Sequence, residues 1–175
     1  MDKMMALYYD KVGEYVRDMA IEGLYTMPSF RPDLVIENAD GHPIAVVEVK
    51  SRLNLSTDVA TEMRRNILER GLPVHIPYFL LLSQDIGYLW KESKRNGSEE
   101  TPAYVFPMDK VIARYSKRAS DRRLYETELS LLVLQWLTHL STEALEASEE
   151  PEKTLALSGF SDSIKHAMVL IEEEL

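Results

Sequence analysis

The segment Pro32–Ser51 constrains the fold of this chain more than any other, because two strand-like runs flank a tight-turn signal. The runs cover 32–38 and 43–51, and Asp40-Gly41 between them is typical of a hairpin turn. Positions 44–47 are apolar without interruption, as expected for a strand that is covered on both faces. The sequence therefore predicts an antiparallel hairpin at the centre of a covered sheet.

Helices and further strands surround this hairpin. Helical spacing of apolar residues predicts helices over 3–22, 58–70, 122–147 and 161–174. Short apolar runs predict strands over 76–83, 88–90 and 103–106, and the polar residues 92–102 are expected to form an exposed loop. This order is that of an α/β sandwich. A chain of 175 residues has room for one core, so we expect a single domain, 1–175.

The composition excludes several classes of protein. The absence of cysteine excludes disulfide scaffolds, thiolate zinc sites and thiol catalysis, and fits a reducing cytoplasm. The N-terminal residues lack the long apolar core of a signal peptide. The longest apolar stretch, 76–82, is far too short to span a bilayer. We therefore expect a cytoplasmic protein with no membrane partner.

The net charge of −9 is distributed unevenly along the chain. Residues 1–125 carry 18 basic and 18 acidic side chains, whereas residues 126–175 carry 2 basic and 11 acidic ones. The acidity therefore belongs to the C-terminal segment. The neutral remainder can still present a basic face to a nucleic acid, because the local field matters more than the total charge.

Two carboxylates and one amine are predicted to meet at the open end of the hairpin. Because side chains alternate along a strand, Glu48 and Lys50 point to the same face about 6–7 Å apart, and the turn brings Asp33 beside them. Carboxylates suit hard cations, so Asp33, Glu48 and the backbone carbonyl of Val49 are candidate ligands of Mg²⁺ or Mn²⁺. Such a cation would activate water for attack on a phosphodiester, and Lys50 would orient that water or stabilise developing charge.

The spacing of these residues resembles a known signature. Pro32-Asp33, followed after fourteen residues by Glu48-Val49-Lys50, is similar to the PD-(D/E)xK motif. The order helix, hairpin, helix and two strands resembles restriction-endonuclease-like nucleases over roughly residues 3–92, and the stretch 77–90 resembles bacterial members of that superfamily.

The resemblance implies an α/β/α sandwich with a central mixed sheet. The nuclease-like core would cover 1–110, and 111–175 would be a helical C-terminal extension. Asp33 and Glu48 would be the metal ligands and Lys50 the catalytic lysine, with DNA as the expected substrate.

A further acidic ligand is less well defined. By resemblance it would come from the first helix, where Glu14 is favoured and Asp18 and Glu22 remain open. In the second helix, Glu62 lies at the edge of the apolar stripe, from where it could reach the site.

Basic residues cluster after position 109. Two interpretations have equal support: contact with nucleic-acid phosphates, or a solvated helix face balanced by the acidic C-terminal segment. The candidates are Lys110, Arg114, Lys117, Arg118, Arg122 and Arg123.

Two functions follow from these patterns. The first is a Mg²⁺- or Mn²⁺-dependent nuclease that acts on DNA. The alternative is a catalytically inactive interaction module on the same fold, because one fold can host many functions. The Leu-rich stretch 129–140 is most simply explained as core, and it is also dense enough in apolar residues to serve such a module as a homodimer face.

Overall fold

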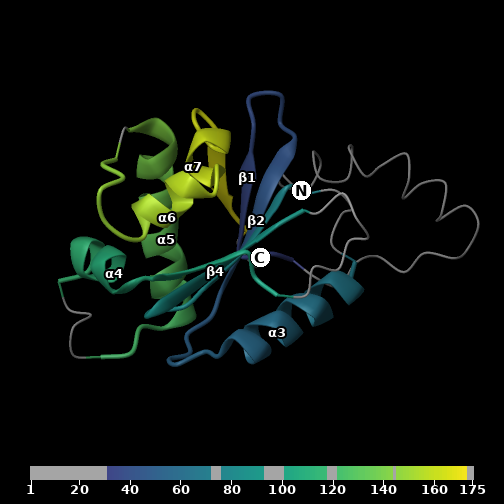
Figure 1. The fold of residues 1–175 in the computed structure, drawn as a ribbon, viewed down its shortest axis with the longest axis vertical. Helices are drawn as coiled ribbons and strands as arrows, with labels where there is room; N and C mark the ends of the chain where they lie inside the picture. The colour runs from purple at the N-terminus through teal and green to yellow at the C-terminus, as the bar shows by residue number, and fades with distance from the viewer. Residues whose placement is uncertain (1–30, 72–75, 93–100, 118–121, 144, 173–175) are drawn as a thin grey trace, which may run out of the picture.

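The computed structural model describes residues 31–71, 76–92, 101–117, 122–143 and 145–172. These residues form an α/β structure in which helices cover both faces of a mixed sheet (Figure 1). The sheet has six strands in the order β5-β4-β3-β2-β1-β6. Their bounds are β1 Leu34–Glu37, β2 Pro43–Val49, β3 Tyr78–Leu82, β4 Ile86–Lys91, β5 Tyr104–Pro107 and β6 Met168–Ile171.

The predicted hairpin is confirmed, and it lies inside the sheet. β1 and β2 pair antiparallel with Leu34 opposite Val47, and Gly41 in the connecting turn has a φ of 73°, which suits glycine. β2 then pairs in parallel with β3, and Glu48 lies opposite Leu81. The carboxyl ends of β2 and β3 therefore meet at one edge of the sheet.

Helix α3, Thr57–Glu69, connects β2 to β3 and confirms the helix predicted over 58–70. Ser56 caps it by accepting a hydrogen bond from the Val59 amide at 3.3 Å. Its apolar residues Ala60 and Ile67 are buried against the sheet. Crossover through a helix is the usual connection between parallel strands.

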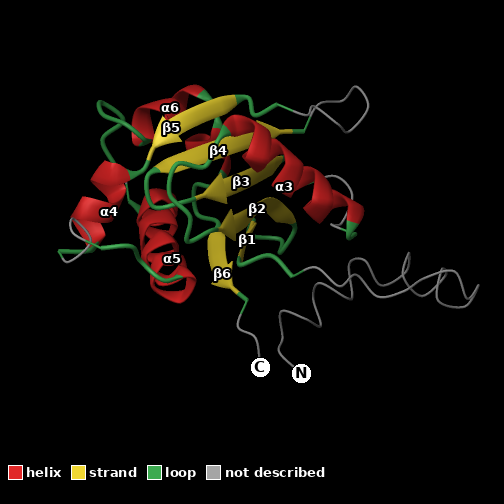
Figure 2. Cartoon of the chain, turned by 90° about the horizontal axis from the view of Figure 1, so that it is seen from below, coloured by secondary structure: helices red, strands yellow, loops and turns green. Residues whose placement is uncertain are grey.

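The two faces of the sheet have separate cores. Val47 and Val49 pack with Trp136 and Leu137 of α5, Glu126–Thr142. On the opposite face, a smaller cluster that includes Val46 packs under α3. Figure 2 shows α3 on one side of the strands and α5 on the other. The shorter helices α4 Asp109–Tyr115, α6 Glu152–Leu157 and α7 Phe160–Ser163 accompany α5 (Figure 1).

The predicted C-terminal helix over 161–174 is wrong. The chain forms only the short α7, takes a positive φ of 60° at His166, and then enters β6. β6 pairs antiparallel along the whole of β1, so the backbone groups of β1 are satisfied on both sides. The spacing of apolar residues in this segment fits a helix, but pairing with β1 decides its structure.

The long helix predicted over 122–147 is shorter than expected. α5 begins at Glu126, where the Glu128 carboxylate accepts a hydrogen bond from the Tyr125 amide at 3.0 Å. It ends at Thr142, because Glu143 is extended. Residues 122–124 are therefore a non-helical connection and not a first helical turn.

None of the helices in the described segments is both long and apolar enough to cross a bilayer. The helix predicted over 3–22 lies outside the described residues.

Candidate active site

The open end of the hairpin brings Asp33 to β2. The Asp33 carboxylate accepts a hydrogen bond from the Val49 amide through Oδ2 at 2.7 Å. Its own backbone carbonyl accepts a hydrogen bond from the Glu172 amide, just after β6, at 3.0 Å. Asp33 is thus held from both sides, by β2 and by the C-terminal strand.

Glu48 and Lys50 form a close ion pair beside Asp33. Lys50 Nζ donates to Glu48 Oε1 at 2.6 Å. The side chain of Glu48 is only 7% exposed, whereas that of Lys50 is 29% exposed and reaches solvent. The two side chains therefore lie on the same face, as the alternation of side chains along the strand predicts.

Among the described residues, the second oxygen of Glu48 has no hydrogen-bond partner. Oε2 is buried and accepts no hydrogen bond from the described residues. Buried polar atoms are nearly always satisfied, so an exception of this kind calls for a specific explanation such as a bound ion. A buried carboxylate oxygen left without a donor also costs free energy.

The pKa of Glu48 reflects this environment. Burial, followed by the negative charge of Asp33, raises the pKa of Glu48 from 4.5 to about 7, against the opposing effect of the hydrogen bond from Lys50. Burial acts to lower the pKa of Lys50, but its hydrogen bond to Glu48 and the nearby carboxylates, including Glu126, raise it overall. The site therefore carries more negative than positive charge once Glu48 ionises.

The side chains of Asp33 and Glu48 are chemically suited to bind a divalent cation. Asp33 and Glu48 offer two carboxylates, and Oε2 of Glu48, which has no donor within the described ranges, is an oxygen ligand of the kind that Mg²⁺ or Mn²⁺ requires. Within the described ranges, no three carboxylate or imidazole side chains gather into one metal-binding group. A cation here would thus depend on two carboxylates together with backbone oxygen or water, and Val49 O remains the predicted backbone ligand.

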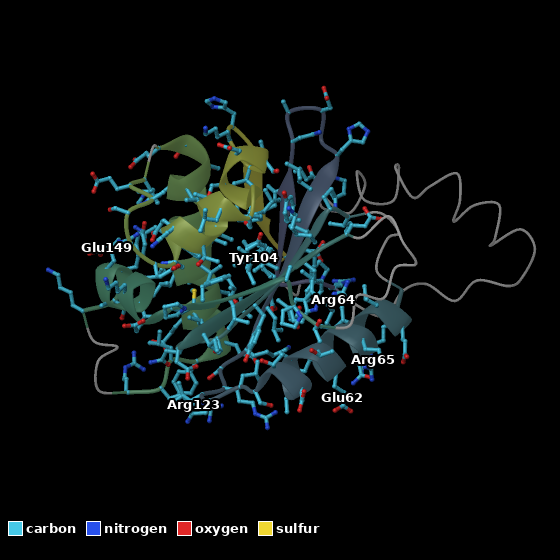
Figure 3. All side chains as sticks on the ribbon, in the orientation of Figure 1. Glu62, Arg64, Arg65, Tyr104, Arg123 and Glu149 are labelled. Carbon is cyan, nitrogen blue, oxygen red and sulfur yellow. The ribbon has the colours of Figure 1, made fainter. Side chains whose placement is uncertain are left out.

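Of the two predicted accessory acids, only one belongs to the described residues. Glu14 lies outside them. Glu62 is exposed, and Figure 3 shows it on the side of α3 that faces away from the sheet. On the other side of the helix, the Arg64 guanidinium lies over the rings of Phe79 and Trp90.

Much of the basic cluster is used in ion pairs with acidic residues further along the chain. Lys110 Nζ lies 3.0 Å from Glu149 and Arg114 Nη1 lies 2.6 Å from Glu152. Lys117 is exposed, and Arg118 lies outside the described residues. The C-terminal segment therefore balances part of the charge of α4, and phosphate contact by these residues stays a prediction.

A set of hydrogen bonds joins the end of β2 to the segment before α5. Ser51 Oγ donates to the Leu124 carbonyl at 2.5 Å and accepts from Arg123 Nε at 3.2 Å. Gln84, after β3, donates to the Arg122 carbonyl at 2.9 Å and accepts from the Leu124 amide at 2.8 Å. The roles of Ser51 and Gln84 could not be predicted from the sequence, because the bonded residues are 38 to 73 positions apart and no local pattern connects them.

Comparisons with known proteins do not assign the chain to a family. No family model matches it, and neither the curated proteins nor the solved structures contain a significant match.

Proposed function

We propose that the protein is a metal-dependent phosphodiesterase of the restriction-endonuclease-like fold. Its active site, formed by Asp33, Glu48 and Lys50, cleaves DNA. The observation that carries this proposal is the buried Glu48 carboxylate, whose Oε1 is bound by Lys50 and whose Oε2 receives no hydrogen bond from the part of the chain that the structure describes. A buried carboxylate oxygen without a donor destabilises an apolar protein interior, but it is useful in a site that binds a cation.

Each of the three residues has a separate role. Asp33 and Glu48 hold Mg²⁺ or Mn²⁺, which when bound makes water more acidic and neutralises charge on the phosphodiester. The amide of Val49 fixes the Asp33 carboxylate, so this ligand is oriented before any cation binds. Lys50, which is half-buried, presents its ammonium to the charge that develops on the phosphate.

The test is cleavage of supercoiled plasmid in Mg²⁺ and in Mn²⁺. We expect Asp33→Asn, Glu48→Gln and Lys50→Met each to reduce the cleavage rate by at least about a hundredfold. Glu37→Gln is the matched control, because Glu37 is a buried glutamate at the opposite end of the same hairpin and should keep the full rate. Equal rates in the wild type and all three site variants would refute the assignment.

The alternative is a catalytically inactive interaction module, possible because the ion pairs of α4 remove basic groups from nucleic-acid contact. Calorimetry with Mn²⁺ separates the two functions. Binding that is lost in Glu48→Gln supports the phosphodiesterase. Absence of binding, together with a stable dimer in sedimentation, supports the module.

A further inference from the structure

The segment 122–124 is fixed at the edge of the sheet where the candidate active site lies. Four hydrogen bonds, two through Ser51 and two through Gln84, hold it against the loops that follow β2 and β3. Leu124 is buried and anchors the segment in the core under α5. The guanidinium of Arg123 therefore binds the side chain of Ser51, the residue that directly follows the proposed catalytic lysine Lys50.

Arg123 differs from its neighbour Arg122 in how its guanidinium is used. Arg122 makes two hydrogen bonds to the Glu128 carboxylate, at 2.7 and 3.3 Å, so its charge is balanced. Arg123 is exposed, and Nε uses one hydrogen bond to the neutral Ser51 hydroxyl. Figure 3 shows Arg123 at the edge of the molecule where the chain passes from β2 towards α3.

We propose that Arg123 binds a backbone phosphate of the DNA strand that flanks the phosphodiester cleaved at Asp33, Glu48 and Lys50. This inference rests on the proposed function. Within the basic cluster predicted from the sequence, it singles out Arg123 as the residue that holds a negatively charged strand near the acidic site.

The preorganisation of Arg123 supports this role. The planar guanidinium recognises phosphate through paired donors, and fixing Nε on Ser51 reduces the entropy lost when the two Nη groups bind. Arg52, in the same loop after β2, is exposed as well and adds positive charge to this edge. The two arginines oppose the repulsion between DNA and the carboxylates Asp33 and Glu126.

The test is the affinity of a short fluorescent DNA duplex for the full chain, measured in EDTA by anisotropy at rising KCl concentrations. We expect Arg123→Gln to weaken binding by about tenfold. The slope of log affinity against log salt should become shallower by about 0.9, the value for one lost phosphate contact. Arg123→Lys, which keeps the charge and loses the bond to Ser51, should fall between the wild type and Arg123→Gln.

Arg122→Gln is the matched control, and it should leave both affinity and slope unchanged because its charge is already paired with Glu128. The inference is overturned by unchanged affinity in Arg123→Gln, by equal losses in the two variants, or by a wild type that shows no salt-dependent binding. A wild type that binds the duplex but does not cleave plasmid counts against the proposed reaction alone, because the ranking of the variants still decides the role of Arg123.

Discussion

Glu48 and Glu152 are buried to a similar degree, with 5% and 2% of the whole residue exposed. Each forms an ion pair with an N–O distance of 2.6 Å. Their surroundings differ in how completely the carboxylate is used. Oε1 of Glu152 accepts from both Arg114 and Trp136, and neither of its oxygens is a buried atom without a partner. Oε2 of Glu48 is such an atom.

The difference teaches which of the two carboxylates is structural. Glu152 joins α4, α5 and α6 through Arg114 and Trp136, so its charge and its hydrogen-bonding capacity serve the packing of helices. The side-chain hydrogen bond of Glu48 is with Lys50, only two residues further along the same segment. The negative charge of Asp33 also lies nearby. A carboxylate in that position raises the free energy of the folded state and gains a favourable role only when a cation is bound.

The largest expected effect concerns metal affinity. Glu48→Gln should reduce the affinity for Mn²⁺ on the order of a thousandfold, because one of two anionic ligands is lost while the side-chain volume is kept. Glu152→Gln should bind Mn²⁺ as the wild type does, since this carboxylate is already bound by two donors. Isothermal calorimetry measures both. Similar losses in the two variants would show that Glu48 has no special role in binding the cation.

The pH dependence of stability tests the same contrast with a slightly smaller effect. The pKa of Glu48 is about 7 in the folded state and ordinarily 4.5, so the folded state binds the proton more tightly than the unfolded state does. This stabilisation is complete below the unfolded value and is lost as the pH rises through about 7. We expect a loss of about 2–3 kcal/mol between roughly pH 5 and 8, measured by urea unfolding without metal.

The same two substitutions, Glu48→Gln as the test and Glu152→Gln as the control, apply to this pH profile. Glu48→Gln should remove most of the fall in stability, whereas Glu152→Gln should retain it. A wild-type profile that rises over this interval would contradict the raised pKa of Glu48.

The hairpin and the position of Glu48 and Lys50 could be predicted because the responsible signals are local. Asp40-Gly41 specifies the turn, and the alternation of side chains fixes which face receives Glu48 and Lys50. The geometry at the open end is consistent with that register, since Asp33 lies one position before Leu34 and contacts the amide of Val49, two positions after Val47, the partner of Leu34.

The parts that could not be predicted depend on contacts between distant segments. The segment of β6 was expected to be helical because the spacing of its apolar residues fits a helix. Pairing with β1 makes it a strand instead. Likewise, the pairing of Lys110 with Glu149 and of Ser51 with Leu124 depends on how α4 and α5 pack. The resemblance to nucleases identified the candidate site, but it carried no information on these contacts.

The structural role of Glu152 predicts a loss of stability of intermediate size. Glu152→Ala should lower the free energy of unfolding by about 2 kcal/mol, because the buried Trp136 Nε1 loses its acceptor and Arg114 loses its partner. Arg114 is 40% exposed and can turn to solvent, which limits the cost. Urea unfolding measures the change, and Glu149→Ala at the neighbouring exposed ion pair is the control that should change stability little.

The smallest expected effect is that of Lys110→Ala. Lys110 and Glu149 are 53% and 69% exposed, so their pair should contribute less than about 0.5 kcal/mol to stability. Because the ammonium is already paired with Glu149, duplex affinity in the anisotropy assay should also stay close to that of the wild type. A loss of affinity as large as that of Arg123→Gln would return the DNA-binding face to α4, and it would show that the acidic C-terminal segment releases its basic partners when DNA binds.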